Sequence, residues 1–487
     1  MTTNQSLHHW LAKLNDVTVL CVGDVMLDQY VYGDVDRMSP EAPIPVLNVS
    51  RRDEAIGGAG NVVCNIAALG AHANLVAVIG DDPAGAQVRE RLAGLEGTGP
   101  QLLVDPDRPT TVKTRFIAGS QQLLRADDES AGDLATSLLD QIVASASIVL
   151  GAQEPGAVIL SDYGKGVLPD AVISQLISAA QAAKVPVVVD PKGTDYSKYA
   201  GADVLTPNRK ELSEATRMVI GDTDEIVAAA ERLIDNCGVR HVLVTRGGEG
   251  MSLVSADVAP LHLPALAREI FDVSGAGDTV VAVLASGLAA GMEVGAAAQL
   301  ANVAAGLVVA KVGTAVVRNG ELADAVDAVA NISKSIVDEK QLAEQIAQWR
   351  SRRLSIGFTN GCFDLVHPGH VSLLEQAHSQ CDRLIVGLNS DGSVSRLKGA
   401  DRPVQTAAAR GRVLASLAAV DAVVVFEEDT PVELIKQIRP DVLVKGADYA
   451  IDEVVGGDIV QSYGGRVVLA DLVDGFSTTE TIARLSR

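Results

Sequence analysis

The chain has 487 residues, which is more than one ordinary hydrophobic core accommodates, and this length predicts two or three domains. Hydrophobic residues make up 47% of the chain and charged residues 21%, a globular balance that excludes wholesale disorder. The formal net charge of −22 repels polyanions, so we expect no nucleic acid partner, whereas small phosphorylated substrates fit a local basic pocket.

Cysteine usage and the apolar stretches bear on the cellular compartment. The first 17 residues lack a basic region followed by an apolar stretch, so we expect no signal peptide. The uncharged stretch 294–310 is shorter than the roughly 20 residues of a membrane span, and we predict a buried helix there. We therefore expect a cytoplasmic protein without a membrane partner. Its scattered cysteines, which form no CxxC pair and favour reduced thiols, are Cys21, Cys64, Cys237, Cys362 and Cys381.

Apolar runs alternate with helix-like segments through the first two-thirds of the chain. Because strands that alternate with helices form βαβ units, this order predicts a mainly parallel sheet covered by helices. Residues 28–58 interrupt the alternation, and we predict short strands and turns there that form a small β lid over the site. The predicted strands are 17–24, 75–82, 157–164, 185–193, 203–208 and 241–250, and the clearest predicted helices are 168–184 and 223–238.

A second set of alternating elements follows a charged helical stretch at 332–353. A strand is predicted over 354–364, a helix over 370–381 and a further strand over 383–391, and the alternation continues to the end of the chain. The sequence thus predicts an α/β protein with two doubly wound domains. We expect a first domain at 1–331, a linker helix at 332–353 and a smaller Rossmann-like domain at 354–487.

The segment DVSGAGDT, residues 272–279, precedes an alanine-rich helical stretch. Its small residues Gly275, Ala276 and Gly277 let backbone N–H groups converge on an anion at a helix N-terminus. Asp278 follows in the first helical turn, where an acid also has the simpler role of complementing the helix dipole. A second glycine-rich segment, GGAGNVVCN at 57–65, fits either a plain turn into a helix or a binding loop.

Four motifs in order resemble those of the ribokinase-like sugar kinases: GGxGN near residue 60, TPNxxE at 206–211, TRGGEG at 245–250 and DVSGAGDT. The resemblance spans roughly residues 10–320 and implies ATP-dependent phosphorylation of a sugar, with Asp278 as the base and the amides of residues 275–277 as the anion hole. It also implies that Glu211 acts on Mg²⁺ through water; no other metal ligand is predicted. The implied ATP contacts are Asn208, Arg209, Lys210, Glu211, Thr245, Gly247, Gly250 and Asn302.

The same resemblance implies a sugar site built from the end of the first strand and the GGxGN segment. Asp24 also fits a simple strand-ending turn, and each cation taken alone fits a solvated surface charge. The implied sugar contacts are Asp24, Asp28, Gly57, Gly58 and Asn61. A phosphate on the sugar would be bound by Lys113, Arg115, Arg125 and Lys165, together with Lys192.

The segment TNGCFDLVHPGHVSLL, residues 359–374, is the most specific motif in the chain. His367 and His370 are three residues apart, so on a helix they face the same way, and Pro368 suits a helix start. Two imidazoles there can donate hydrogen bonds to an α-phosphate as its charge rises. A metal-binding pair and ordinary surface histidines are the alternatives, and the sequence shows no third metal ligand nearby.

This segment resembles the HxGH nucleotidyltransferases of the cytidylyltransferase type, over roughly residues 354–487. GFSTTE at 475–480 is similar to a late phosphate-binding segment of that family, and it also reads as a capping box of Ser477 and Glu480. The arginine frequent before that segment is missing from DLVDG at 471–475, which argues against strict glycerol- or choline-phosphate cytidylyltransferase chemistry. The implied nucleotide contacts are Thr359, Asn360, Phe363, Lys398, Arg402, Lys445, Ser477, Thr478 and Thr479.

The two halves in this order resemble the bifunctional heptose kinase/adenylyltransferases of lipopolysaccharide core precursor synthesis. That resemblance implies phosphorylation of D-glycero-D-manno-heptose 7-phosphate at C1 and, after another enzyme removes the 7-phosphate, AMP transfer from ATP to give ADP-heptose and pyrophosphate. It leaves open a homodimer through the kinase domain. Two other interpretations stay open: a kinase with a cytidylyltransferase acting on another sugar or polyol phosphate, and a non-catalytic nucleotide-binding regulator, against which Asp278, His367 and His370 argue.

Overall fold

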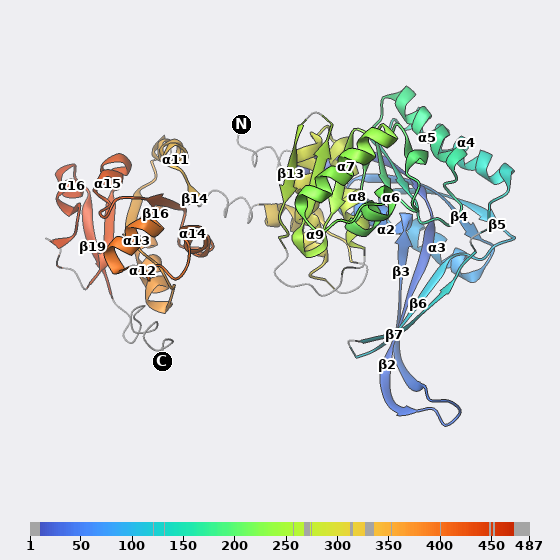
Figure 1. Ribbon diagram of the computed structural model, residues 1–487, viewed down its shortest axis with the longest axis horizontal. Coiled ribbons are helices and arrows are strands. Elements are labelled where there is room, and N and C mark those ends of the chain that lie inside the picture. The colour runs from blue at the N-terminus through green and yellow to red at the C-terminus, as the bar shows by residue number, and fades with distance from the viewer. Residues whose placement is uncertain are drawn as a thin grey trace. The chain divides into compact units, whose positions relative to one another are not determined.

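The chain divides into two compact units, Met1–Val326 and Asp327–Arg487 (Figure 1). The computed structural model describes residues 10–119, 121–130, 132–256, 258–266, 273, 275–311, 315–326, 336–351, 353–399, 401–447, 450 and 453–471. Within these ranges, no helix has both the length and the apolar character needed to cross a membrane. The prediction of two α/β domains is confirmed.

The first unit contains a nine-stranded sheet in the order β13-β12-β11-β10-β9-β8-β1-β4-β5. The pairs from β5 to β11 are parallel, and β12 and β13 add an antiparallel edge. The predicted strands are present. Most of them are shorter than predicted, because their predicted ranges include polar loop residues, whereas β4 begins three residues earlier and ends two residues earlier than predicted. The strands are β1 (Thr18–Gly23), β4 (His72–Gly80), β5 (Thr98–Asp105), β8 (Ala157–Ser161), β9 (Val187–Asp190), β10 (Val204–Leu205), β11 (His241–Thr245), β12 (Met251–Ser255) and β13 (Val258–Leu263).

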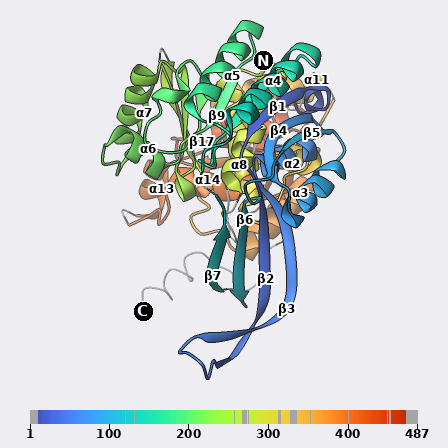
Figure 2. The same cartoon turned by 90° about the vertical axis from the view of Figure 1, so that its right-hand side faces the viewer.

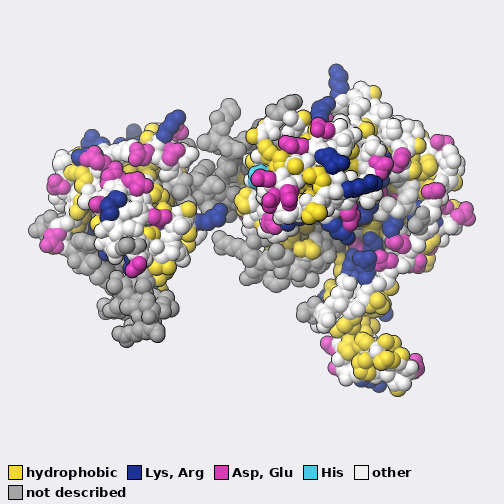
Figure 3. All heavy atoms as spheres, in the orientation of Figure 1, with side chains coloured by type: hydrophobic (Ala, Val, Ile, Leu, Met, Phe, Trp, Pro, Cys, Tyr) yellow, Lys and Arg dark blue, Asp and Glu magenta, His cyan; other side chains and the backbone are white. Residues whose placement is uncertain are grey.

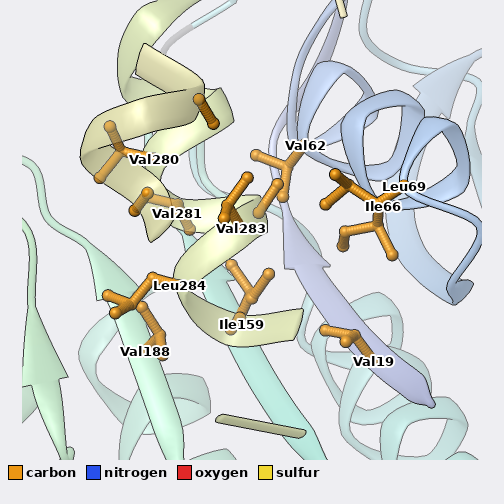
Figure 4. Packing of buried hydrophobic residues seen from close by; sticks show 14 of the residues in the cluster. Val19, Val62, Ile66, Leu69, Ile159, Val188, Val280, Val281, Val283 and Leu284 are labelled. Carbon is orange, nitrogen blue, oxygen red and sulfur yellow. The ribbon is translucent and has the colours of Figure 1, made fainter. Parts of the chain in front are cut away.

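Alternate residues of the central strand β1 enter two separate hydrophobic cores. Val19 and Cys21 pack in one core, while Leu20 and Val22 pack in the other, as the two-residue period of a strand requires. Helices α2 and α8 pack on the first face (Figure 4), which α9 also covers. Helices α4, α5 and α7 cover the second face. The helices are α2 (Ala59–Ala68), α3 (Pro83–Ala93), α4 (Thr136–Ala152), α5 (Asp170–Ala183), α6 (Arg209–Thr216), α7 (Thr223–Cys237), α8 (Ala276–Ala289) and α9 (Val294–Val308). The predicted buried helix at 294–310 corresponds to α9.

A separate four-stranded sheet, in the order β3-β2-β6-β7, extends from the first unit as an arm (Figure 2). The prediction of short strands and turns over residues 28–58 is wrong, because β2 and β3 each run for 14 residues and pair along their length. The second pair of strands comes from residues 112–128, which the sequence pattern did not assign to the lid. The strands are β2 (Val25–Met38), β3 (Pro45–Gly58), β6 (Val112–Ala118) and β7 (Gln121–Asp128).

The second unit contains a six-stranded parallel sheet in the order β14-β17-β16-β15-β18-β19. Ile385 of β16 enters one core and Leu384 and Val386 enter the other, so helices cover both faces. The strands are β14 (Ile336–Val337), β15 (Ile356–Gly361), β16 (Arg383–Asn389), β17 (Ala422–Phe426), β18 (Val442–Gly446) and β19 (Arg466–Ala470). The helices are α11 (Glu339–Ser351), α12 (Pro368–His378), α13 (Asp391–Lys398), α14 (Ala407–Ala415), α15 (Val432–Ile438) and α16 (Gly457–Ser462).

The segment 332–353 is not a linker helix over its described part. Strand β14 pairs with β17, and Leu342 and Ile346 of α11 are buried in the core of the second unit. The Arg350 guanidinium donates hydrogen bonds to the carbonyls of Ile438 and Arg439 at 2.7 and 2.8 Å. Residues 336–351 therefore belong to the second domain, because removing them would expose one edge of its sheet and part of its core.

Candidate active sites

The first candidate site lies at the carboxyl ends of the parallel strands of the nine-stranded sheet. The strand order reverses around β1, which lies between β8 and β4, and open α/β sheets bind ligands outside the carboxyl ends of strands at such a point. Asp24 follows β1, the loop 162–167 follows β8, and Asp190 ends β9. The sheet thus brings together polar residues that are far apart in the sequence.

Asp278 lies in the first turn of α8, directly behind the glycine-rich segment. Gly275 caps this helix with a positive φ of 77°, a conformation that glycine adopts without steric cost. The Asp278 side chain is buried, and both of its carboxylate oxygens accept hydrogen bonds. The Tyr163 hydroxyl donates to Oδ1 at 2.5 Å, and the Asn61 amide donates to Oδ2 at 2.6 Å.

Burial raises the pKa of Asp278 to about 6, because a charged carboxylate loses its hydration there. The hydrogen bonds from Tyr163 and Asn61 pull this pKa down; the nearby Asp28 carboxylate raises it, and the Lys113 ammonium lowers it. A carboxyl with a pKa of about 6 is ionised at neutral pH and is a stronger base than an ordinary aspartate. The arrangement can accept a proton from a hydroxyl group held beside it.

A cavity of about 190 Å³ joins Asp278 to two of the predicted ATP motifs. Asn208 and Glu211 reach it from the start of α6, and Thr245 reaches it from the end of β11. Glu211 also completes a capping box with Asn208, and its carboxylate lies 3.2 Å from the Lys192 ammonium. The residues that line the cavity are Tyr163, Asp190, Thr206, Asn208, Glu211, Thr245, Gly275, Gly277, Asp278 and Val280.

The other predicted ATP residues lie outside the lining of this cavity. Arg209 pairs with Glu249 at 2.5 Å, and the exposed Lys210 lies 3.7 Å from Glu214. Asn302 donates a hydrogen bond to the Pro264 carbonyl at 2.9 Å. Gly247 and Gly250 shape the turn after β11 with φ values of 60° and 95°. A Cβ atom at Gly250 would lie 2.0 Å from the Leu263 carbonyl oxygen, so this position has no room for a side chain.

Asp24, predicted to contact the sugar, holds a loop of the protein itself. Its buried carboxylate accepts hydrogen bonds from the backbone N–H groups of Tyr163, Lys165 and Val167 at 2.9, 3.0 and 3.2 Å. These contacts fit the alternative interpretation of Asp24 as a turn-forming residue. They fix the loop 162–167, which carries Tyr163 to the Asp278 carboxylate.

Gly57 and Gly58 allow the lid strand β3 to approach the first strand end closely. A Cβ atom at Gly57 would lie 2.4 Å from the Asp28 carboxylate, and one at Gly58 would lie 2.4 Å from the Asp24 carbonyl oxygen. Gly58 also has a positive φ of 59° where α2 begins. The GGxGN segment therefore places Asn61, in the first turn of α2, within reach of Asp278.

Most of the cations predicted to grip a phosphate are paired with acids. Asp28 pairs with Arg115 at 2.6 Å, Arg125 pairs with Asp127 at 2.8 Å, and Lys165 pairs with Glu129 at 2.5 Å. The half-buried Lys113 has no carboxylate within ion-pair distance in the described part of the chain. Burial lowers the pKa of Lys113, and its ammonium lies 5.9 Å from the centre of the Tyr163 ring.

The second candidate site lies where β15 ends, in the middle of the six-stranded sheet. The strand order reverses around β15, which lies between β16 and β18. His367 is the N-cap of α12, Pro368 is its first residue, and His370 lies in its first turn. The two imidazole rings stack with their centres 3.8 Å apart, and the Phe363 ring packs 5.1 Å from His370. The predicted histidine pair is thus formed at a helix N-terminus.

Burial lowers the pKa of both histidines. The pKa of His370 falls to about 4, because its ring is desolvated and because a charge on His367 would repel a second positive charge. Burial also lowers the pKa of His367. Both rings are neutral at pH 7, and a neutral ring has one N–H group to donate. In the structure, each ring makes a hydrogen bond with the backbone, at Leu365 for His370 and within His367 itself. In the described part of the chain, no group of three His, Cys, Asp or Glu side chains is arranged to hold a metal ion.

The other predicted nucleotide contacts surround this histidine pair only in part. Thr359 is buried in β15, and the Lys445 ammonium donates to the Asn360 carbonyl at 2.9 Å. Arg402 pairs with the buried Asp364 at 2.5 Å, and Lys398 is exposed at the end of α13. Ser477, Thr478 and Thr479 lie outside the described residues.

Arg410 is a residue of the second site that the sequence did not reveal. Its side chain is fully buried, and it donates hydrogen bonds to the carbonyls of Cys362, Asn389 and Gln405. It also donates to the Asp391 carboxylate at 2.7 Å. Arg410 therefore ties the loop after β15 to the loop after β16. An arginine in an amphipathic helix ordinarily indicates a solvated face, so the residue pattern contains no signal for this contact.

Family models match both parts of the chain. A model for the pfkB family carbohydrate kinases covers residues 17–319, and a cytidylyltransferase-like model covers residues 358–480. Among solved structures, phosphofructokinase-2 from Escherichia coli in complex with substrates and products has a TM-score of 0.54 and 19% identity. It covers 64% of this chain and 99% of its own. Ribokinase from Arabidopsis thaliana, complexed with ribose and ATP, has a TM-score of 0.50 and 22% identity over 64% of this chain and 98% of its own. These two likenesses show the fold.

Curated relatives match the chain along its whole length, and they carry the name bifunctional protein HldE. The relative from Paramagnetospirillum magneticum is 56% identical over 490 residues, which cover 100% of both chains. The relative from Rhodospirillum rubrum is 55% identical and covers 100% of this chain and 98% of its own. The relative from Caulobacter vibrioides is 54% identical and covers 99% of this chain and 100% of its own.

Proposed function

The chain belongs to the family of bifunctional HldE proteins, and we propose that its two domains catalyse two steps on the route to ADP-heptose. The protein is an enzyme with a sugar kinase domain and a nucleotidyltransferase domain, and both use ATP. The proposal adds the substrates, the residue roles and the divalent cation. The observation that carries it is the cavity that joins Asp278 and the anion-hole glycines to Asn208, Glu211 and Thr245.

In the first step, ATP phosphorylates the C1 hydroxyl of D-glycero-D-manno-heptose 7-phosphate. The Asp278 carboxylate accepts the proton of that hydroxyl, and its pKa of about 6 suits this transfer at neutral pH. The N–H groups of Gly275, Ala276 and Gly277 stabilise the charge on the transferring phosphoryl group. Lys113, the half-buried cation of β6 without an ion-pair partner in the described structure, contacts the 7-phosphate.

Mg²⁺ fits the same cavity. The carboxylates of Asp190 and Glu211 line it beside Asp278, and carboxylate oxygens are ligands that Mg²⁺ prefers. The Asp190 and Glu211 side chains would hold the ion through water against the phosphates of ATP. The ion supplies charge neutralisation as the phosphoryl group moves.

In the second step, the 1-phosphate of the dephosphorylated heptose attacks the α-phosphate of ATP and displaces pyrophosphate. His367 and His370 donate hydrogen bonds to the α-phosphate as its negative charge increases. Each neutral ring has one N–H group, which then bonds to the phosphate in place of the backbone. The phosphates are held by Lys398, Arg402 and Lys445 together with the segment Ser477–Thr479. The nucleotide is contacted by Thr359, Asn360 and Phe363.

The protein acts as a cytoplasmic homodimer whose kinase domains meet through their lids. Apolar side chains gather at the end of the lid sheet that lies farthest from the nine-stranded sheet (Figure 3), where Met38 and Ile44 are 57% and 56% exposed. A second copy of this sheet offers a matching apolar surface. Sedimentation of the full chain tests this point: Ile44→Glu should yield monomers, and dimers that persist in this variant would reject the lid interface.

Product analysis tests the two reactions. The protein is incubated with ATP, Mg²⁺ and either heptose 7-phosphate or heptose 1-phosphate, and the products are identified by ³¹P NMR and mass spectrometry. We expect heptose 1,7-bisphosphate from the first mixture and ADP-heptose with pyrophosphate from the second. Replacing ATP by CTP in the second mixture separates adenylyl from cytidylyl transfer. Phosphorylation of another sugar phosphate alone, or transfer only from CTP, would overturn the proposal.

A further inference from the structure

Tyr163 is placed against the Asp278 carboxylate by two independent contacts. Its backbone N–H donates to the buried Asp24 carboxylate at 2.9 Å, and its hydroxyl donates to Oδ1 of Asp278 at 2.5 Å. Its neighbours Lys165 and Val167 are bound to the same Asp24 carboxylate through their own N–H groups. The loop after β8 therefore cannot move Tyr163 away from Asp278 without breaking the hydrogen bonds of a buried acid.

Most of the groups around Asp278 destabilise its negative charge, and only a few stabilise it in the described part of the chain. Asp28 of β2 and Asp190 of β9 face it as further acids. The Asp28 carboxylate raises the pKa of Asp278, while burial and the Asp278 charge raise the pKa of Asp190 well above its ordinary value. Cys21 of β1 and Cys64 of α2 also face it, and burial raises both thiol pKa values, so neither thiol carries charge at neutral pH. The groups that stabilise the charge are the Lys113 ammonium of β6 and the hydrogen bonds from Tyr163 and Asn61.

Tyr163 itself remains a hydrogen-bond donor over the whole working range of pH. Burial and the Asp278 charge raise its pKa well above the ordinary value of a phenol, so its hydroxyl keeps its proton. A neutral donor that bonds to a buried carboxylate stabilises the ionised form by about 1.5–3 kcal/mol, which equals about 1–2 pH units of carboxyl titration.

We propose that Tyr163 is a positioning residue of the kinase site, whose hydroxyl holds Asp278 ionised and turned toward the sugar hydroxyl. Oδ1 bonds to Tyr163 on the loop after β8, and Oδ2 bonds to Asn61 in the GGxGN segment that borders the sugar site. Each oxygen keeps a second lone pair, so Asp278 can still accept the sugar proton without losing either partner. The inference rests on the proposed role of Asp278 as the base.

The test replaces Tyr163 by Phe in the full chain and titrates Asp278 directly. Difference infrared spectroscopy follows the protonated carboxyl band that the Asp278→Asn protein lacks, and this measurement needs no substrate. We expect the midpoint to rise by about 1–2 pH units in Tyr163→Phe. The kinase kcat/KM should fall by about 5- to 50-fold at pH 6 and recover to within about twofold of wild type above pH 9.

Two further variants separate this role from a loss of packing. Tyr199→Phe also removes a buried hydroxyl, one that donates to the Asp162 carboxylate at 2.6 Å, and it should leave the Asp278 midpoint unchanged. Site-specific 3-fluorotyrosine at position 163 keeps the shape with a stronger donor, so it should lower the midpoint even if Tyr163→Phe does not fold. An unchanged midpoint in both Tyr163 variants, or a kinase loss equal at every pH, would overturn the inference. A wild-type protein that phosphorylates no sugar phosphate would instead refute the proposed function, and the infrared titration would still decide the role of Tyr163.

Discussion

The two candidate active sites share a position in their folds, yet burial shifts the pKa values of Asp278 and His370 in opposite directions. Asp278 and His370 each lie in the first turn of a helix at the carboxyl edge of a parallel sheet. Burial raises the pKa of the acid to about 6 and lowers the pKa of the imidazole to about 4. Desolvation penalises the charged form in both cases, and that form is the anion of Asp278 and the cation of His370.

The sites also differ in how their reactive groups are held. Both oxygens of Asp278 accept side-chain hydrogen bonds, from Tyr163 and from Asn61. His370 instead packs against the rings of His367 and Phe363, and the buried Arg410 fixes the backbone of the loop before it. The proposed base thus has polar neighbours that stabilise its charge, whereas the two histidines are positioned by ring packing and by the backbone.

The largest expected effect concerns Asp278, because the contrast between the two sites is lost if Asp278 is not the kinase base. Asp278→Asn keeps the shape of the side chain but cannot take up the hydroxyl proton, so kinase kcat should fall by about 10²–10⁴-fold. Nucleotidyl transfer should remain at the wild-type level. The exposed Asp34→Asn in the lid is the control, and a variant that retains more than about half of the kinase activity would reject the role.

Replacing either histidine of the pair should have a somewhat smaller effect on kcat, and only nucleotidyl transfer should be affected. His367→Ala or His370→Ala should lower kcat of nucleotidyl transfer by about 10²–10³-fold, because the lost hydrogen bond strengthens as the transition state forms. ATP affinity should change much less, which equilibrium binding beside single-turnover rates can establish. His378→Ala at the far end of α12 is the control. Weak ATP binding with a normal rate at saturating ATP would show that the histidines are ground-state ligands.

Removing Arg410 should weaken the second domain alone. Arg410→Ala leaves the carbonyls of Cys362, Asn389 and Gln405 without this donor in a buried setting, and we expect a loss of roughly 3 kcal/mol in its unfolding free energy. Chemical denaturation, followed by the fluorescence of Trp349 in α11, measures this change. Arg412→Ala, two residues along the same helix on its exposed side, should change stability little. Equal losses in both variants would contradict the role of Arg410.

The opposite pKa shifts predict different responses of the two reactions to acid. With Asp278 as the proposed base, kinase activity should be lost as pH falls through about 6, by about 10-fold between pH 7 and pH 5. His370 becomes charged only near pH 4, so its protonation should not slow nucleotidyl transfer in that range. Both reactions are measured with saturating substrates on one sample. Parallel declines of the two rates would show that the burial of the two sites does not set their working pH.

The glycine-rich and HxGH motifs could be predicted from the sequence because their contacts are local. Gly275 and Asp278 lie within one helical turn, and so do His367 and His370, so residue spacing alone brings them together. The structure adds the cavity that joins Asp278 to Asn208, which lies 70 residues earlier in the chain. The roles assigned to these residues in binding ATP or the sugar remain predictions.

What the sequence did not reveal depends on long-range contacts of ordinary-looking residues. Tyr163 and Arg410 reach Asp278 and Cys362 only through the order of the strands, which spacing does not encode. Asp24 was predicted as a sugar contact, but its carboxylate holds the loop after β8. Residues 332–353 have a charged helical pattern that suits a linker, yet β14 and α11 complete the second domain by pairing and packing within it.

Separating the two domains tests the central claim that each contains a complete active site. Fragments 1–331 and 332–487 keep β14 and α11 with the second sheet, and each has its own hydrophobic cores. The measurement is the kcat of both reactions for each purified fragment, alone and mixed, beside the full chain. We expect the first fragment to phosphorylate the sugar phosphate and the second to transfer the nucleotidyl group, each with a kcat within a few-fold of the full chain. Two folded fragments that are inert alone and recover activity only when mixed would contradict it.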